Sequence, residues 1–125
     1  MTIISSTKSS EEARRGEIWK VNFEPTIGSE IKKKRPAIVL SINGLTYLPV
    51  RLVVPLTEWN KKHIDNPWCI PIEPSIKNGL QKKSAADVLQ MRCVSTERLI
   101  EQTGNVSAEI MEDIAAALVM VTGYA

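Results

Sequence analysis

Hydrophobic and polar residues alternate along much of the chain, with the two-residue period that is typical of half-buried strands. Alternation over 17–23 places Trp19 and Phe23 on one face and predicts a strand. The nearly continuous apolar run over 37–42 predicts a strand buried on both faces. Later stretches with similar patterns are predicted to be strands as well: 50–56, 68–72 and 86–94.

Proline, glycine and polar residues separate these stretches. Asn43-Gly44 is a strong hairpin signal between two predicted strands. Pro36 favours an extended backbone at Arg35, so Arg35 is expected where a loop becomes a strand. Pro55 cannot donate a ladder hydrogen bond, so strand 50–56 is expected to be an edge strand or to be bulged there.

A helical period appears only near the C-terminus. Ser107 is a favourable N-cap, apolar residues then recur every three or four positions, and Gly123 ends the pattern. Ser95 can cap an earlier, short helical turn. Short strands, tight turns and one terminal helix predict a mostly β (α+β) fold. We expect an SH3-like barrel, or a curved antiparallel sheet of about five to seven strands, with a C-terminal helix.

The chain has 125 residues, the size of one domain. Residues 1–13 are rich in serine and threonine and are predicted to be a disordered tail before a single domain over 14–125. No apolar run approaches the roughly 18–20 residues of a membrane span, and the sequence shows no basic region followed by an apolar leader. We therefore expect a cytoplasmic protein with no membrane partner.

The net charge of +2 is small, but the cations are clustered. They gather in the runs 32–35, 61–62 and 82–83, which suits contact with phosphates over a short site. Cys69 and Cys93 fit neither a CxxC pair nor a zinc spacing. We expect both cysteines to be small buried residues in a reducing compartment.

Several familiar chemistries are excluded by missing residues. The sequence has no glycine-rich phosphate loop, no HExxH motif and no carboxylate cluster spaced for a metal, so neither a metal nor a cofactor is expected. His63 is the single histidine, which rules out a two-histidine ribonuclease mechanism within one chain. A lone histidine in a polar loop is expected to be solvated. Arg35 and Thr57 remain as candidates, together with Gln90 and Arg92, which are expected to share one face of the strand 86–94. Taken separately, these residues also fit surface or turn roles.

Short blocks of residues, in order along 14–123, resemble the signature of the MazF/PemK toxins. The order of the blocks makes the resemblance specific. They are Arg15-Gly16-Glu17-Ile18-Trp19, Phe23-Glu24-Pro25, Gly28-Ser29-Glu30, the run 34–41 (KRPAIVLS), Val54-Pro55-Leu56-Thr57, Ser84 through Gln90-Met91-Arg92, Glu97-Arg98-Leu99 and Gly104.

The resemblance implies the toxin of a type II toxin–antitoxin system. Such proteins are homodimers that cut single-stranded RNA, including mRNA, at short sequences without a metal, which inhibits translation and growth. The 2′-hydroxyl attacks the adjacent phosphate and leaves a 2′,3′-cyclic phosphate and a 5′-hydroxyl. The implied partner is a MazE-like antitoxin whose disordered acidic and apolar tail occupies the RNA groove.

The resemblance also implies the site residues. Arg35 and Thr57 match the arginine and threonine held responsible for catalysis, and a guanidinium can hold two phosphate oxygens while a hydroxyl donates a third hydrogen bond to the same oxygens. The general base stays open, with Glu30 as one candidate. The residues assigned to RNA binding are Glu30, Lys33, Lys34, Ser84, Gln90 and Arg92. The loops 31–34 and 58–66 depart from the family's pattern.

Two alternatives keep the fold and change the function. A gyrase poison of the same fold binds a protein through its C-terminal helix and cuts nothing. A non-catalytic barrel would bind RNA or protein without cleavage. A gyrase binder needs neither Arg35 nor Thr57, so cleavage of RNA by purified protein in EDTA separates these functions.

Overall fold

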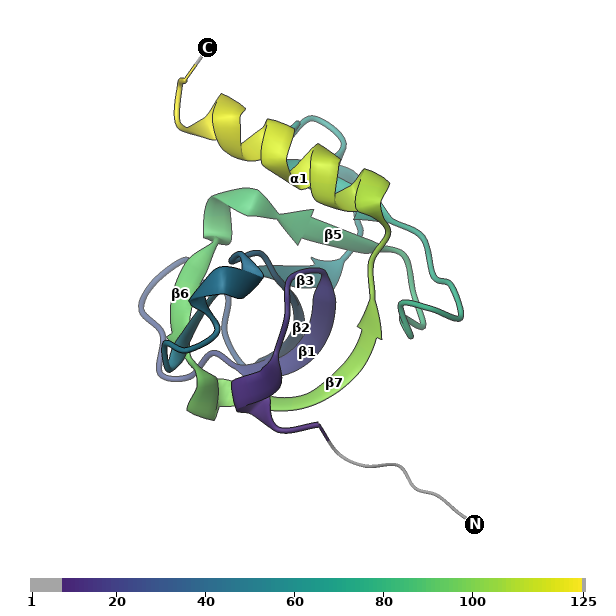
Figure 1. Ribbon diagram of the computed structural model, residues 1–125. Helices are drawn as coiled ribbons and strands as arrows, with labels where there is room; N and C mark the ends of the chain where they lie inside the picture. Colours follow the sequence, from purple (N-terminus) through teal and green to yellow (C-terminus); the bar gives the residue numbers. More distant parts are fainter. Residues whose placement is uncertain (1–7, 125) are drawn as a thin grey trace.

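The structure, a computed structural model, describes residues 8–124 as one strongly curved sheet with a single α-helix (Figure 1). The strands are β1 Glu17–Asn22, β2 Lys34–Val39, β3 Val50–Glu58, β4 Cys69–Ile72, β5 Ser84–Asp87, β6 Arg92–Ser95 and β7 Leu99–Asn105, and the helix is α1 Ala108–Val121. The short 3-10 helices are η1 Ser10–Glu12, η2 Asn43–Leu45, η3 Lys61–His63, η4 Val88–Gln90 and η5 Thr96–Arg98.

All strand pairs are antiparallel, in the order β4-β5-β3-β2-β1-β7, and β6 also pairs with β3. The strands wrap around a common centre, and α1 lies across the end of the sheet near β5 (Figure 1). The mostly β fold with a curved sheet and a C-terminal helix is therefore confirmed. The pairing does not close the sheet into a complete barrel within the described residues, because β4 and β7 stand at its two ends.

The stretch 86–94 was predicted to be one strand, and this prediction is wrong. The chain follows β5, turns through η4 and continues as β6. Both strands pair with the same edge of β3, β6 with its first half and β5 with its last residues. The turn carries the chain from one half of β3 to the other, so Gln90 and Arg92 do not share one face of a strand.

Pro55 lies inside a central strand and is buried, so the expectation of an edge or a bulge is also wrong. Pro55 pairs with Ala37 of β2 on one edge of β3. On the other edge, the ladder with β6 ends at Val53 and the ladder with β5 begins at Leu56. The missing N–H of Pro55 falls in the gap between these two ladders, so no strand hydrogen bond is lost.

The core forms on both faces of the curved sheet. Inside the curve, Trp19 of β1 and Phe23 just after it are fully buried, and they pack with residues of β2, β3 and β7. On the other side, Ile114 of α1 packs against the apolar face of β3 and β4. The helix begins as predicted after Ser107, whose Oγ accepts the N–H of Ile110 at 3.2 Å, and ends before Gly123.

Residues 8–13, predicted to be part of a disordered tail, are packed onto the domain. Ala13 is fully buried, and the buried guanidinium of Arg51 donates to the carbonyls of Ala13 at 3.0 Å and Glu11 at 2.7 Å. The same guanidinium also donates to the carbonyl of Leu48, at 2.7 Å. Arg51 thus ties the start of the domain to the β2–β3 connection. The remainder of the predicted tail, 1–7, lies outside the described residues.

Two local expectations need correction. Asn43-Gly44 begins the 3-10 turn η2 rather than a two-residue hairpin. Cys69 is buried, and burial raises the pKa of its thiol to about 11, but Cys93 is exposed.

Among residues 8–124, none of the helices combines the length and the hydrophobicity that a membrane span requires.

Candidate active site

A groove of about 670 Å³ opens where β2 and β3 separate. The ladder between these strands ends at the pair Ala37–Pro55. The next pair, Pro36 with Leu56, would be joined by two hydrogen bonds, and Pro36 has no N–H for one of them. The strands part at this point, and side chains from both line the groove.

Arg35 and Thr57 face the groove from its two sides. Arg35 stands two residues before Ala37 on β2, and Thr57 two residues after Pro55 on β3, so strand alternation turns both side chains to the same face. The Nε–H of Arg35 donates to the Lys32 carbonyl at 3.1 Å. Within residues 8–124, the Nη nitrogens of Arg35 and the Thr57 hydroxyl have no protein partner, so their donors remain available to a ligand.

The β1–β2 loop forms one wall of the groove, and Gln90 holds this loop. The N–H of Ile31 donates to Gln90 Oε1, and Gln90 Nε2 donates to the Ser29 carbonyl, each at 3.3 Å. Glu30 lines the same wall, and its Oε1 accepts the N–H of Ile27 at 2.6 Å. Gln90 therefore lines the groove while its amide positions the loop.

A smaller hollow of about 250 Å³ extends the groove and shares Glu30 and Gln90 with it. Arg92 lines this hollow. Its guanidinium carbon lies 5.7 Å from the centroid of the Phe23 ring, and its Nη1 donates to the Phe23 carbonyl at 3.4 Å. The structure thus holds the Arg92 cation in a fixed position beside the groove.

The β3–β4 connection forms another wall and contributes His63. This side chain is only 4% exposed, so the expectation of a solvated histidine is wrong. Its Nδ1 accepts the Asn60 N–H at 3.0 Å, and its ring lies 5.3 Å from that of Trp59. Asn60 in turn caps η3, since its Oδ1 accepts the N–H of Lys62 at 3.0 Å. These local bonds fold a polar segment into a compact wall.

Asp87, the last residue of β5, adds a carboxylate to the groove. Its Oδ1 is buried and has no hydrogen-bond partner in the described part of the chain. Burial raises the pKa of the Asp87 carboxyl, and the amides of Leu89 and Gln90 with the charges of His63 and Lys62 offset this only in part. The groove is therefore lined by one acid with a carboxyl oxygen that has no partner among the described residues.

The structure brings four of the predicted site residues together in the groove: Glu30, Arg35, Thr57 and Gln90. Arg92 lies in the adjoining hollow. Of the cations that line the groove, Lys32 and Lys62 were not assigned to the site from the sequence. His63 and Asp87 were missed as well, because neither the burial of a loop histidine nor an unpartnered acid leaves a signal in the sequence.

Lys33, Lys34 and Ser84 do not line the groove. Lys34 lines a hollow with Lys20 on the opposite face of β2 from Arg35, because consecutive strand residues alternate between faces. Ser84 is buried, and its hydroxyl donates to the Lys82 carbonyl at 3.1 Å. The alternation of strand residues was the signal that would have separated Lys34 from Arg35.

Comparison with known proteins identifies the family. Residues 14–122 match the PemK-like, MazF-like toxins of type II toxin–antitoxin systems. The chain belongs to this family. It is 36% identical over 111 residues to Endoribonuclease MazF9 of Mycobacterium tuberculosis, an alignment that covers 84% of this chain and 92% of MazF9.

Solved MazF structures share the fold. MazF from Deinococcus radiodurans superposes with a TM-score of 0.75 at 21% identity, over 89% of this chain and 96% of that one. A mycobacterial endoribonuclease solved with its cognate antitoxin gives a TM-score of 0.71 at 18% identity, over 90% and 97% of the two chains. The resemblance drawn from the sequence blocks is thereby confirmed.

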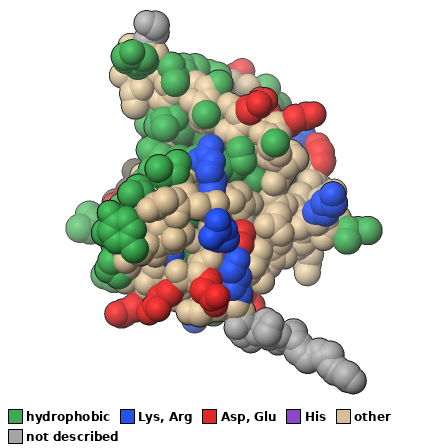
Figure 2. Space-filling view, in the orientation of Figure 1, with side chains coloured by type: hydrophobic (Ala, Val, Ile, Leu, Met, Phe, Trp, Pro, Cys, Tyr) green, Lys and Arg blue, Asp and Glu red, His purple; other side chains and the backbone are tan. Residues whose placement is uncertain are grey.

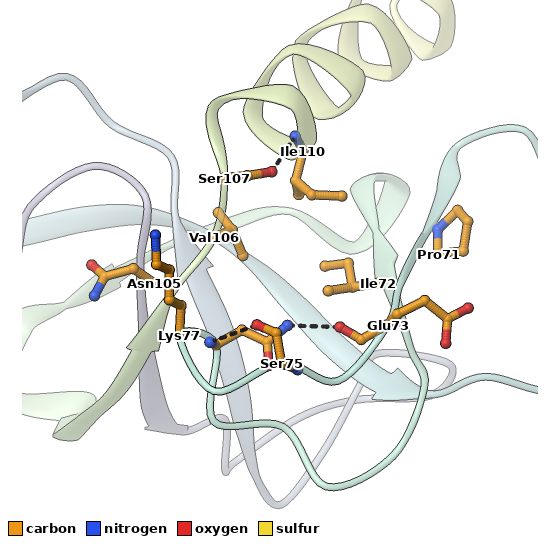
Figure 3. A pocket seen from close by; sticks show the side chains of 10 residues that line it. Pro71, Ile72, Glu73, Ser75, Lys77, Asn105, Val106, Ser107 and Ile110 are labelled. Carbon is orange, nitrogen blue, oxygen red and sulfur yellow. Dashed lines mark hydrogen bonds between the residues drawn. The ribbon is translucent and has the colours of Figure 1, made fainter.

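This MazF-like toxin has a further cavity, of about 470 Å³, beside the start of α1 (Figure 3). Several of its polar groups already bind each other. Asn78 Nδ2 donates to the Glu73 carbonyl at 2.8 Å, Asn78 Oδ1 accepts the Ser75 N–H at 2.9 Å, and Ser107 caps α1. In the groove between β2 and β3, by contrast, donors of Arg35 and Thr57 and one oxygen of Asp87 have no partner among the described residues.

Proposed function

We propose that this MazF-like toxin cuts single-stranded RNA in the groove between β2 and β3, with Arg35 and Thr57 at the scissile phosphate. The 2′-hydroxyl attacks the adjacent phosphorus, the bond to the 5′-oxygen breaks, and the products carry a 2′,3′-cyclic phosphate and a 5′-hydroxyl. The observation that carries the proposal is the convergence of a guanidinium and a hydroxyl, both with unpaired donors, on one groove.

These two side chains suit the charge that develops during the reaction. In-line attack builds negative charge on the non-bridging oxygens, and Arg35 can donate to two of them through its free Nη nitrogens. The Thr57 hydroxyl donates one more hydrogen bond from the opposite side. Preorganised donors of this kind are each worth roughly 3–4 kcal/mol in the transition state. Glu30 lines the groove and is our candidate to accept the proton of the 2′-hydroxyl.

The RNA backbone follows the cations along the groove. Lys32 and Lys62 line it, and Arg92 extends the track into the adjoining hollow. Gln90 keeps the β1–β2 loop in place beside them. Lys33 and Lys34, although exposed and close in sequence, contribute less because they stand outside the groove.

We also propose that the protein acts in the cytoplasm as a homodimer. An apolar hollow of about 530 Å³ lies between the β2–β3 connection and α1, and Leu45, Leu48 and Leu118 are among its lining residues. Figure 2 shows hydrophobic side chains gathered beneath α1 and on the adjoining surface. Covering such a surface with a second copy removes apolar area from water. The groove also suits an acidic antitoxin segment that competes with RNA, as the mycobacterial relative was solved with its cognate antitoxin.

The test is cleavage of a long single-stranded RNA by purified protein in excess EDTA, with the new 5′ ends mapped by sequencing. We expect cleavage at a short sequence, 5′-hydroxyl ends, and a loss of about a hundredfold or more in rate for Arg35→Ala. Lys20→Ala is the control, because it removes an exposed cation from the neighbouring strand β1 outside the groove.

Three results would contradict the proposal: cleavage that needs an added metal, normal cleavage by Arg35→Ala, or no cleavage by the wild-type protein. Intact RNA together with inhibition of a topoisomerase would favour a gyrase poison instead.

A further inference from the structure

The Asp87 carboxyl lines the groove and is only partly satisfied, because the backbone amides of Leu89 and Gln90 bond to it but one of its oxygens has no partner. Its Oδ1 is buried without a hydrogen-bond partner, and within residues 8–124 no lysine or arginine forms an ion pair with it. A buried acceptor without a partner costs free energy, so such groups are rare and need an explanation, one of which is a bound ligand. Burial raises the pKa of this carboxyl more than the Leu89 and Gln90 amides lower it.

Asp87 stands close to the proposed reaction centre. In the β3–β5 ladder, Thr57 is paired with Ala85, and Asp87 follows two residues later on the same face. Diagonal neighbours of this kind are about 7–8 Å apart in antiparallel sheets. Both side chains line the groove. Asp87 therefore lies within reach of a nucleotide next to the scissile phosphate.

RNA offers a carboxylate two kinds of donor: the ribose 2′-hydroxyl, which every nucleotide carries, and the N–H groups of the bases, which differ from base to base. Phosphates are anions and are repelled by it. Donors occur on the bases, and the amino groups of adenine, cytosine and guanine lie on the Watson–Crick edge, which proteins read in single-stranded RNA. Uracil has no amino group there, and its one N–H is flanked by two carbonyl oxygens that a carboxylate repels.

We propose that Asp87 selects one base of the RNA, accepting a hydrogen bond from the amino group of adenine, cytosine or guanine and rejecting uracil. The proposal rests on the proposed function, since it assumes that RNA occupies the groove. Asp87 acts on the choice of sequence and leaves the chemical step to Arg35 and Thr57.

The wall beside Asp87 is built rigidly enough to fix a base. His63 is held by the Asn60 N–H at its Nδ1, and the Trp59 ring packs against it at 5.3 Å. Lys83 Nζ lies 4.9 Å from the centroid of the Trp59 ring. Rigid walls raise the free-energy cost of binding a wrong base, because a polar group that this base leaves unpaired cannot move to another partner.

The first test compares cleavage sites mapped on one long RNA for the wild-type protein, Asp87→Asn and Asp113→Asn. Asp113 is exposed on α1 and does not line the groove, so it serves as a matched control. We expect the wild-type protein to exclude uracil at one position of its site. In Asp87→Asn that exclusion is relaxed about tenfold, because an amide can also donate to a carbonyl oxygen, while all other positions are unchanged.

Two outcomes overturn the proposal while cleavage persists. An identical sequence preference for Asp87→Asn and the wild-type protein would mean that Asp87 reads no base. An equal loss of rate at every site would instead make Asp87 part of the catalytic or structural machinery.

The second test needs no cleavage and separates this proposal from the proposed function. Short 2′-O-methyl oligonucleotides of cytidine and of uridine cannot be cut, and their bases differ only at N3 and at position 4. The wild-type protein is expected to bind the cytidine oligonucleotide about tenfold more tightly, and Asp87→Asn to lose this preference. Equal binding of the two by the wild-type protein overturns the role of Asp87. A preserved preference in a protein that does not cut RNA overturns the proposed function alone.

Discussion

Arg35 and Thr57 stand on opposite sides of one groove because the ladder between β2 and β3 ends two residues short of each of them, at the pair Ala37–Pro55. Pro36 prevents the next hydrogen-bonded pair from forming. The missing N–H of Pro36 thus lets β2 and β3 separate between the two side chains that the proposed reaction uses.

The Thr57 hydroxyl is expected to matter for rate and not for folding. Thr57→Val keeps the shape of the side chain and removes a donor that has no protein partner in the described structure. We expect single-turnover cleavage to slow by about a hundredfold and the melting temperature to stay within a few degrees. Thr103→Val, at an exposed position of β7 outside the groove, is the control for the cleavage rate only, because the Thr103 hydroxyl donates to the Ile18 carbonyl at 3.4 Å and its loss can affect stability. Wild-type rates for Thr57→Val would remove this hydroxyl from the mechanism.

Neighbouring lysines on opposite faces should differ in their effect on RNA binding. Lys32 lines the groove, whereas Lys34 lines a hollow on the other side of β2. Lys32→Ala is expected to reduce the slope of log affinity against log salt by about 0.7, the value for one lost phosphate contact on a single strand. Lys34→Ala should leave the slope unchanged. Titration of a non-cleavable RNA at several salt concentrations measures both slopes, and an equal change in the two variants would contradict the placement of the groove.

The Asp87 carboxyl should make the folded protein less stable as the pH rises. Its pKa is raised in the folded state by burial, so the folded protein binds its proton more tightly than the unfolded chain does. The stability from this group is fully present below the unfolded pKa of about 3.9 and is lost as the pH rises through the higher folded pKa. Asp87→Asn should therefore match or exceed the wild-type melting temperature near neutral pH and lose this dependence. A large destabilisation by Asp87→Asn would indicate a structural role.

The Glu17 carboxylate should contribute stability with the opposite pH dependence. Burial alone would raise its pKa, but the Lys8 ammonium, the Trp19 Nε1–H at 3.0 Å and the Arg14 N–H at 2.9 Å lower the pKa overall. The stability is present above the unfolded pKa of about 4.3 and is lost as the pH falls through the lower folded pKa.

Glu17→Gln should lower the free energy of unfolding at neutral pH by about 1–3 kcal/mol, and the two proteins should converge in acid. Chemical denaturation across this pH range measures the difference. Glu101→Gln, exposed on β7, is the control. A gap between Glu17→Gln and the wild-type protein that stays constant down to low pH would contradict the assignment.

The sequence predicted best the elements whose signals are local. The strand at 17–23 and the helix after Ser107 followed from periodicity and a cap, and both are confirmed. The stretch 86–94 was mistaken for one strand because its shape depends on β3, a distant partner that it pairs with twice. Alternation along a strand says which faces are apolar, but it does not say where a chain leaves one ladder for another.

The site residues were likewise predicted only where the sequence itself carries a signal. Arg35 and Thr57 were found through the resemblance, and the structure places both in one groove. His63 and Asp87 were missed. The burial of His63 depends on its hydrogen bond with Asn60 and its contact with Trp59. Asp87 is distinguished by a buried carboxyl oxygen without a hydrogen-bond partner, which only the structure reveals.

The buried guanidinium of Arg51 has a practical consequence for work with this toxin. It joins the backbone at Glu11 and Ala13 to the carbonyl of Leu48, whose side chain lines the apolar hollow under α1. An affinity tag fused ahead of residue 8 is therefore anchored near the surface where a second copy would dock. A purification handle placed after residue 124 follows α1, whose Leu118 lines the same hollow, so a tag at either position can affect docking of a second copy.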